Sequence, residues 1–354
     1  MRYLLRAAAA LGLSAALVGA PVAAETPISV GQGKPFKHKP SGIVVSADIA
    51  GGIPRGAVAQ YDDKQLDVIV DYRSPGDTEV TTIFLFRNVT GDVPLWFDRI
   101  QQTVESGNKL GVMKLAIPPA AFTPAGQSNA RGLRAVYGAS GAGFTSSAAA
   151  LTATGEWYVA VRESSKTLTP EQLQARLEQT FAAIQWPKEK VATPVAAAMT
   201  DCSKPLAQGE DAQPAPADTG SLLIASVLGG IVTNAPDKSE VVAPARWCRD
   251  PYKIDGAGVY RPDNSTDGYL IAFQDAGRGI WVGKNGIAGL LSSASEPTFM
   301  VESIDMDHRD GFTSFKTLPN VAQALWLAEK GARTYSSSTW GKNKNINIST
   351  DAIK

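Results

Sequence analysis

Short stretches of alternating hydrophobic and polar residues recur along the first half of the chain, a pattern typical of β-strands with one buried face. The clearest is Leu66–Tyr72, in which polar Asp67 and Asp71 interrupt an apolar series. Related patterns predict strands at Gly42–Ile49, Ala57–Tyr61, Val80–Phe86, Leu133–Tyr137, Ala148–Thr152 and Trp157–Val161. We therefore expect this half to be built around a β-sheet.

Two stretches of the same half have helical spacing instead. Asp92 is a suitable N-cap with Pro94 in the first turn, and this predicts a helix that continues to about Ser106. Residues 169–172 (Thr-Pro-Glu-Gln) begin a second helix with a capping box and a proline at the first helical position. Its apolar face is formed by Leu173, Leu177, Phe181 and Ile184.

The second half mixes both patterns as well. Strands are predicted at Gly256–Tyr260, Gly268–Phe273, Gly279–Val282, Thr298–Ile304 and Phe312–Phe315. Pro319 starts a predicted helix that Gly331 ends. Between the halves, residues 188–220 are rich in Pro and Ala and contain no block of like charge, which is typical of a semi-extended linker.

This order of elements predicts an α+β fold: two blocks of antiparallel-rich sheet covered by helices, after a cleaved signal peptide. The expected segments are a signal peptide (1–24), a flexible leader (25–40), an α+β domain (41–187), a Pro/Ala-rich linker (188–220), a second α+β domain (221–349) and a tail (350–354).

The first block resembles the PsbP/Mog1-like α/β sandwich family. The similarity lies in Val80–Arg87 leading into the Asp92 helix and Trp157–Val161 leading into the Thr169 helix. It rests on the order of elements, and no diagnostic motif accompanies it. The resemblance implies a small accessory or assembly domain without a shared catalytic set, so no functional residue is carried over.

The N-terminus has the three parts of a secretory signal peptide. Arg2 and Arg6 precede the apolar run Ala7–Ala20, which is too short for a stable membrane anchor. Small residues follow, and we expect cleavage between Ala24 and Glu25. A retained anchor is the alternative. The signal predicts a periplasmic or secreted protein.

Composition narrows the classes of partner. The chain has 34 Lys and Arg against 34 Asp and Glu, so no excess of basic residues indicates nucleic-acid binding. After the signal peptide no apolar segment is long enough for a transmembrane helix, and Ser221–Val232 is interpreted as a buried core element.

The two cysteines of the chain, Cys202 and Cys248, are predicted to form a disulfide because an exported protein folds in an oxidising compartment. Two free thiols are the alternative. A structural zinc site is not indicated, since no histidine lies near either cysteine.

The chain has only two histidines, and His38 falls in the predicted flexible leader, so a Ser-His-Asp hydrolase would depend on His308. The sequence around Ser140 does not complete a Gly-x-Ser-x-Gly nucleophile elbow. The densest polar cluster holds Asp305, Asp307, His308 and Asp310. Its carboxylates could bind calcium or magnesium, although the spacing is not that of an EF-hand, and a charged loop with internal ion pairs is the alternative.

No catalytic set is complete, so the leading hypothesis is a non-enzymatic binding or accessory module of the cell envelope, whose partner is an envelope protein or a small ligand. A metal-assisted hydrolase with an acidic site at Asp305, Asp307, His308 and Asp310 is the second hypothesis. A secreted surface-interaction protein is the third. Trp281 and Trp340 lie close to glycines and could stack on sugars, but core packing is the more usual role of tryptophan.

Overall fold

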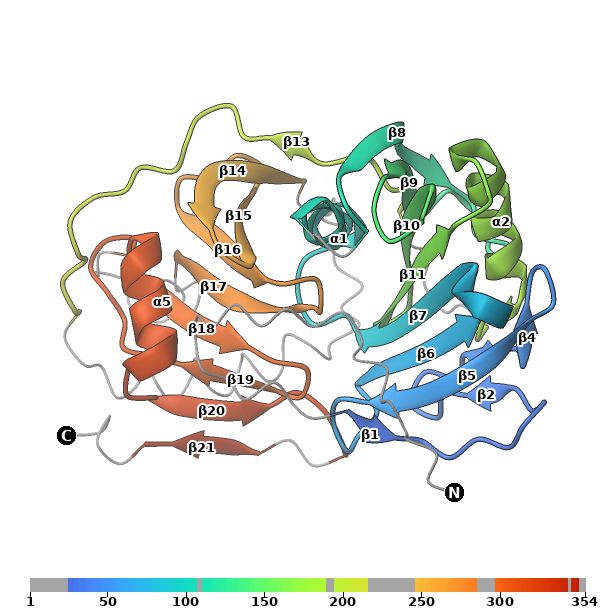
Figure 1. Cartoon of the computed structure of the whole chain (residues 1–354). Coiled ribbons are helices and arrows are strands. Elements are labelled where there is room, and N and C mark those ends of the chain that lie inside the picture. Colours follow the sequence, from blue (N-terminus) through green and yellow to red (C-terminus); the bar gives the residue numbers. More distant parts are fainter. Residues whose placement is uncertain are drawn as a thin grey trace, which may run out of the picture.

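The computed structural model describes residues 25–106, 110–188, 194–215, 246–284, 297–342 and 345–349. The predicted signal peptide (1–24), the apolar stretch Ser221–Val232 and the tail 350–354 lie outside the described residues. Within them, strands far outnumber helices, and most of the strands belong to two large sheets that lie side by side (Figure 1).

The first large sheet is antiparallel throughout and is built from the first half of the chain. Its strands, in spatial order, are β1 (Thr26–Pro27), β5 (Ile53–Gln60), β6 (Asp67–Arg73), β7 (Glu79–Arg87), β11 (Trp157–Ser165), β10 (Ser146–Thr154), β9 (Gly132–Ala139) and β8 (Met113–Phe122), with β4 (Asp48–Ile49) paired to β5. The central pair is β7 and β11, so strands far apart in sequence meet in the middle of the sheet.

The second large sheet is a meander in which each strand pairs with the next one in the sequence. Its strands are β13 (Thr200–Asp201), β14 (Trp247–Ile254), β15 (Ala257–Pro262), β16 (Gly268–Phe273), β17 (Arg278–Lys284), β18 (Phe299–Ile304), β19 (His308–Gly311), β20 (Tyr335–Ser338) and β21 (Ile346–Ile348). All pairs are antiparallel except β13 with β14, which are parallel. β13 lies at the edge of the sheet and comes from the predicted linker.

Three α-helices are described: α1 (Val93–Ser106), α2 (Pro170–Ala182) and α5 (Val321–Lys330); Pro75–Asp77 forms a single 3₁₀ turn, η1. The capping box predicted for α2 is confirmed. The last helix begins after Asn320, whose side chain caps it, and not at Pro319. In Figure 1, α1 lies between the two sheets, whereas α2 and α5 lie on opposite outer sides of the molecule.

The antiparallel sheets are confirmed, but the α+β class is corrected toward a predominantly β structure, because several strands escaped prediction. β8 is one of them: it is an edge strand with Pro118 and Pro119, most of its residues are exposed, and its sequence does not alternate. The strand expected at Phe312–Phe315 is instead β19, four residues earlier. Phe312 and Phe315 are buried, so their hydrophobicity reflects packing and not strand periodicity.

Residues 25–40, predicted as a flexible leader, are packed against the first sheet in the structure. β1 pairs with β5, and β2 (Phe36–Lys37) joins β3 (Val44–Val45) and β12 (Ile184–Gln185) in a small sheet. The side chain of Phe36 is buried in the main hydrophobic core. The Gly, Pro and Lys residues of this segment suggested flexibility, but two parts of it form paired strands.

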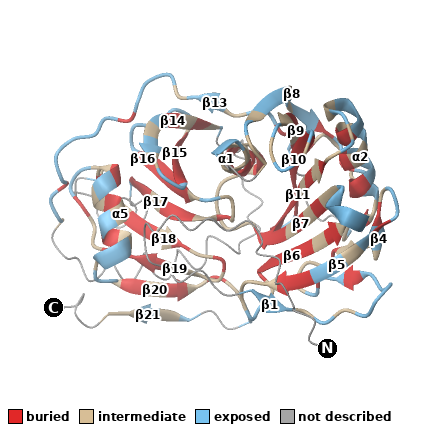
Figure 2. Cartoon of the chain, in the orientation of Figure 1, coloured by how far each residue is buried: buried red, intermediate tan, exposed pale blue. Residues whose placement is uncertain are grey.

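Buried residues run along the central strands of both sheets (Figure 2). Two hydrophobic clusters are present in the described part of the chain, and the second lies between the second sheet and α5. The first cluster belongs mainly to the first sheet, yet it includes Tyr260, Leu270 and Met306 from the second half. The two halves are therefore joined by shared hydrophobic core as well as by polar contacts.

Candidate functional site

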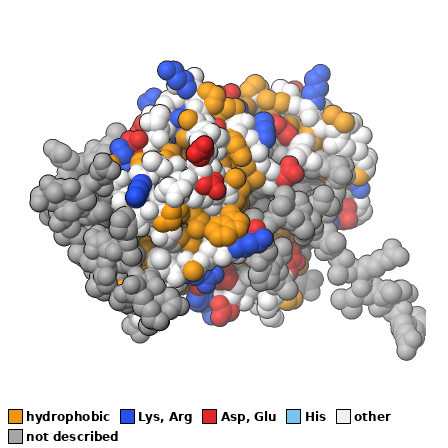
Figure 3. All heavy atoms as spheres, turned by 90° about the vertical axis from the view of Figure 1, so that its left-hand side faces the viewer, with side chains coloured by type: hydrophobic (Ala, Val, Ile, Leu, Met, Phe, Trp, Pro, Cys, Tyr) orange, Lys and Arg blue, Asp and Glu red, His pale blue; other side chains and the backbone are white. Residues whose placement is uncertain are grey.

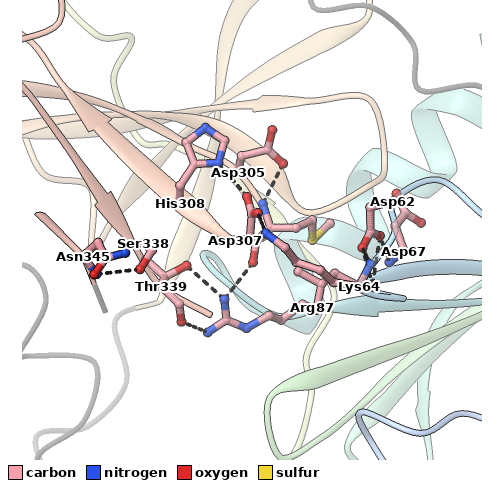
Figure 4. Close-up of polar contacts among 12 residues, drawn as sticks. Asp62, Lys64, Asp67, Arg87, Asp305, Asp307, His308, Ser338, Thr339 and Asn345 are labelled. Atoms are coloured by element: carbon pink, nitrogen blue, oxygen red, sulfur yellow. Dashed lines mark hydrogen bonds and ion pairs between the residues drawn. The ribbon is translucent and has the colours of Figure 1, made fainter. Parts of the chain in front are cut away.

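The acidic residues singled out in the sequence lie where the two large sheets meet (Figure 4). We call residues 305–310, which follow β18 and include the first three residues of β19, the acidic turn; the backbone N–H of Asp305 donates to the carbonyl of His308 and closes the turn. We call the interaction between this turn and the first sheet the polar seam. Its side chains are Lys64, Asp67, Arg87, Arg278, Asp305, Asp307 and Thr339.

Arg278, at the start of β17, links carboxylates from both halves of the chain. Its Nε donates to Asp305 Oδ1 at 2.8 Å, and its Nη1 donates to Asp67 Oδ2 at 3.0 Å. Burial raises the pKa of Asp67 to about 6, although the Arg278 guanidinium acts in the opposite direction. The Asp305 carboxylate is thus bound by an arginine that also binds Asp67 on β6 of the first sheet.

Asp307 is paired on both of its oxygens. Oδ1 lies 2.6 Å from Nδ1 of His308, and Oδ2 accepts from the Lys64 ammonium of the first half. Burial raises the pKa of Asp307, but the hydrogen bonds from His308 and Lys64 outweigh it, so the pKa lies below its usual value. Asp307 is therefore a carboxylate whose charge is neutralised within the chain.

Asp310 lies on β19 and is almost fully buried. Its Oδ2 accepts from Arg333 Nε at 2.9 Å and lies 3.7 Å from Nε2 of His308. Its Oδ1 has no hydrogen-bond partner among the described residues. The imidazole of His308 thus has Asp307 next to one nitrogen and Asp310 farther from the other.

Arg87, at the end of β7, crosses the seam without a carboxylate partner among the described residues. Its Nη1 donates to the Met306 carbonyl at 2.7 Å and to the Thr339 hydroxyl at 3.0 Å, while Nη2 donates to the Thr339 carbonyl at 2.9 Å. Gly277 makes this close approach possible, since a Cβ there would lie 3.2 Å from the Arg87 carbonyl at a backbone φ of +78°.

The geometry favours internal ion pairs over a metal site in the acidic turn. Asp305, Asp307 and Asp310 each have a basic partner, namely Arg278, Lys64 and Arg333. In the part of the chain that the structure describes, no three His, Cys, Asp or Glu side chains are grouped so that they could hold a metal ion. Calcium or magnesium binding therefore stays a prediction, without geometric support from these carboxylates.

Two other residues discussed for catalysis have structural surroundings. His38 is fully buried, with Nδ1 at 2.7 Å from the Ser41 hydroxyl and Nε2 at 2.7 Å from the Gln65 carbonyl, and its ring packs edge-on against Trp157. Ser140 lies in the turn after β9 and donates to the Val112 carbonyl. None of these contacts is with the acidic turn.

The predicted disulfide between Cys202 and Cys248 is confirmed, with Cα atoms 4.8 Å apart. It fixes residues 200–215, which we call the strap, to β14. The strap then follows the second sheet: Leu206 N donates to Asp250 at 2.7 Å, and Ala212 exchanges two hydrogen bonds with the side chain of Gln323 on α5. This part of the predicted linker is therefore an integral layer of the second half.

A cavity of about 810 Å³ lies between the strap and the loop that precedes α5; we call it the strap pocket. Pockets for small ligands usually have volumes of about 300–1,000 Å³. Lys204 and Lys316 supply positive charge, Glu210 and Asp211 supply negative charge, and Leu318 contributes apolar surface. Figure 3 shows the side of the molecule on which α5 lies, where hydrophobic side chains gather among charged ones.

The two tryptophans considered for sugar stacking are partly buried and in contact with other aromatic rings. Trp340 packs edge-on against Trp157 with 5.8 Å between ring centroids, and the Arg87 guanidinium lies 4.9 Å from its ring. Trp281 packs edge-on against Trp247 at 6.3 Å. Trp340 therefore packs between the two halves, whereas the ring contact of Trp281 lies within the second half.

The sequence did not predict the cationic side chains of the polar seam as members of the candidate site. Lys64, Arg87 and Arg278 come from three separate segments, and no local spacing relates any of them to the acidic turn.

Among the described residues, no helix is long and apolar enough to cross a membrane.

No protein-family model matches this chain, and no curated protein is similar to it at a significant level. Among solved structures, a crystal structure of a protein from Bacteroides thetaiotaomicron VPI-5482 is similar over 70% of this chain and 89% of that protein, with 12% identity and a TM-score of 0.20. A similarity at this TM-score carries no argument about fold or function.

Proposed function

We propose that this chain is an exported envelope protein that acts as a non-enzymatic binding or accessory module. The observation that carries the proposal is the polar seam: the carboxylates of Asp305 and Asp307 are bound by Arg278 and Lys64 of the same chain. Catalytic acids and bases need free access to a substrate at hydrogen-bonding distance. Instead, Asp307 contacts the first half of the chain through Lys64, and Asp305 binds Arg278, which also binds Asp67 of the first half.

Export is supported by the disulfide and by the composition of the N-terminus. A bond between Cys202 and Cys248 is stable in the periplasm or outside the cell, where thiols are oxidised. The envelope location follows from the predicted signal peptide. Release into the medium, as a secreted surface-interaction protein, is the variant of this proposal that fractionation of cells and medium would reveal.

For the bound molecule we propose a small ligand in the strap pocket. The pocket combines lysines, carboxylates and apolar surface, as sites for polar organic molecules do. Gly209 lines it and has open space where a Cβ would lie, so a large side chain can be introduced there without a backbone clash.

The test compares wild type with Gly209→Trp, which adds a large side chain to the pocket lining, and with Gly209→Ala as the matched control. Each chain is immobilised and exposed to extract of its own cell envelope, and retained small molecules and proteins are identified by mass spectrometry. A small molecule retained by wild type and Gly209→Ala, but not by Gly209→Trp, supports the proposal. Equal retention by all three chains contradicts a ligand in this pocket.

A metal-assisted hydrolase is the second candidate, and one observation favours it. His308 is 40% exposed, and its Nδ1 lies 2.6 Å from Asp307, an arrangement that can orient an imidazole as a general base. Hydrolysis of ester, phosphate or glycoside substrates that is lost in His308→Gln, while the variant stays folded, would establish this activity. Absence of turnover in wild type with added divalent cations would remove it.

For residues 41–187 we also propose a PsbP/Mog1-like unit. Its support is the order of strands and helices in the sequence, with α1 after β7 and α2 after β11. A structural alignment of this unit alone with members of that family is the test. Strand order that cannot be superposed would remove the proposal.

A further inference from the structure

Glu163 of β11 differs from the other buried acids of the described chain. The others are Asp67, Asp98, Asp250, Glu302 and Asp310, and each forms an ion pair with an arginine. Glu163 is fully buried, and no basic group of the described residues lies within ion-pair distance of it. An ionised carboxylate is strongly disfavoured in such surroundings unless a cation or several donors compensate it.

The hydrogen bonds of Glu163 compensate one of its oxygens only. Oε1 accepts from the hydroxyls of Thr81 on β7, at 3.0 Å, and Thr180 on α2, at 3.4 Å. Oε2 is buried and has no hydrogen-bond partner among the described residues. An ionised carboxylate shares its charge between two oxygens and needs donors on both, whereas the neutral acid carries no charge and has one O–H group.

The charged side chains near Glu163, Arg176 and Glu79, form an ion pair with each other. Arg176 of α2 binds Glu79 of β7, with 3.2 Å between Nη1 and Oε2, and donates to the Ala50 carbonyl at 2.9 Å. On β10, the residue paired with Glu163 is Ala148, which carries no charge. Arg176, whose charge acts on Glu163, is therefore bound to another carboxylate, and that carboxylate disfavours a charge on Glu163.

We propose that Glu163 is a neutral carboxylic acid beneath α2 and forms a pH-sensitive device: α2 is held on the first sheet in mildly acidic surroundings and loosens as the pH rises to neutral. Burial raises the pKa of Glu163 from 4.5 to about 7, while the hydrogen bond from Thr81 and the charge of Arg176 oppose the shift. In an exported protein, which is our proposal for this chain, such a group responds to the pH outside the cytoplasm.

The direction follows from the proton balance. A group whose pKa is raised in the folded state holds its proton more tightly there than when α2 is open. The stability of the closed form is therefore complete below pH 4.5 and falls until about pH 7, where it levels off. Because each pKa unit is tenfold, a shift from 4.5 to about 7 should increase opening of α2 by about 300-fold over this range.

The test measures amide hydrogen exchange of residues 170–182 across this range, corrected for the intrinsic rate, in wild type, Glu163→Gln and Glu178→Gln. Glutamine mimics the neutral acid, whereas Glu178 is a half-exposed carboxylate of the same helix. We expect α2 protection to fall with rising pH in wild type and Glu178→Gln but to stay constant in Glu163→Gln. Protection that is constant in wild type, or that falls equally in Glu163→Gln, overturns the proposal.

A second measurement needs no variant. Carbon-13 labelling of glutamate side chains reports the charge of the Glu163 carboxyl directly by NMR. A Glu163 that remains protonated until neutral pH supports the proposal. A Glu163 that is ionised already in mild acid overturns it, whether or not the glutamine variant folds.

Discussion

Arg87 and Thr339, 252 residues apart in the sequence, form two hydrogen bonds across the boundary between the sheets: Nη1 donates to the hydroxyl at 3.0 Å and Nη2 to the carbonyl at 2.9 Å. The same guanidinium donates to the Met306 carbonyl. One buried side chain therefore satisfies backbone groups of two loops of the second sheet. Backbone groups that lose such a donor in the interior cost about 1–3 kcal/mol each.

The first prediction concerns this arginine. Arg87→Met keeps the length and apolar part of the side chain but leaves the carbonyls of Met306 and Thr339 without their donor. We expect the free energy of unfolding, measured with urea, to fall by about 3 kcal/mol. Arg73→Met is the control, since Arg73 is 39% exposed and its ion pair with Asp77 should matter little. Equal losses in both variants would disprove the role of Arg87.

The second prediction concerns the disulfide. The Cys202–Cys248 bond closes a loop of 46 residues, and the chain-entropy model gives such a bond about 4 kcal/mol. We expect Cys202→Ala/Cys248→Ala to unfold at a markedly lower urea concentration, and wild type to contain no free thiol in a thiol titration under denaturing conditions. The single variant Cys202→Ala distinguishes the bond from packing: if it is as stable as wild type, the disulfide does not stabilise the chain.

Local signals explain which elements could be predicted from the sequence. The capping box of residues 169–172 and the alternation in Leu66–Tyr72 are properties of short segments, and α2 and β6 follow them closely. Most of β8 is exposed, and β13 has two residues, so neither has a periodic pattern to detect. Edge strands are recognised through their neighbours, and the neighbours are set by the tertiary fold.

The acidic turn could be found from sequence, but its surroundings could not. Asp305, Asp307 and His308 are adjacent in the chain, so their clustering was visible. Their partners are distant in the sequence: Lys64 is 243 residues from Asp307, and Arg278 is 27 residues from Asp305. Only folding brings these side chains together. Composition shows only that the chain has equal numbers of acidic and basic residues. The structure shows which of these residues form ion pairs with each other.

The third prediction is a pH dependence that involves Asp67. Burial raises its pKa from 3.8 to about 6, so the folded state binds the proton more tightly than the unfolded state does. Its contribution to stability is complete below pH 3.8 and is lost as the pH rises to about 6. Asp67→Asn should remove about 3 kcal/mol of this change, seen by comparing urea unfolding of the variant and wild type at both ends of that range.

Asp63→Asn is the control for this experiment, because Asp63 is exposed in the same turn region. Its stability should change with pH as that of wild type does. If Asp67→Asn also follows wild type, the buried Asp67–Arg278 pair does not titrate as described.

The fourth prediction concerns divalent cations. Arg278 and Lys64 already neutralise Asp305 and Asp307, so we expect calcium and magnesium to leave the melting temperature of the protein unchanged. A specific site in the folded state would add about 2.7 kcal/mol of stability at a cation concentration 100 times its Kd. Saturable heat in a calcium titration of wild type, lost in Asp305→Asn or Asp307→Asn, would establish a metal site and contradict this expectation.

The last prediction concerns processing of the N-terminus. Cleavage between Ala24 and Glu25 leaves β1 intact, since β1 begins at Thr26 and pairs with Gln60 of β5. It also keeps Glu25, whose carboxylate accepts a hydrogen bond from the Tyr61 hydroxyl at 2.9 Å. Signal peptidases require a small residue before the cut, so Ala24→Arg should accumulate as uncleaved precursor, while Ala24→Gly should be processed normally. N-terminal sequencing of the envelope fraction should begin at Glu25, and an intact Met1 on wild-type protein recovered from the cytosol would contradict export.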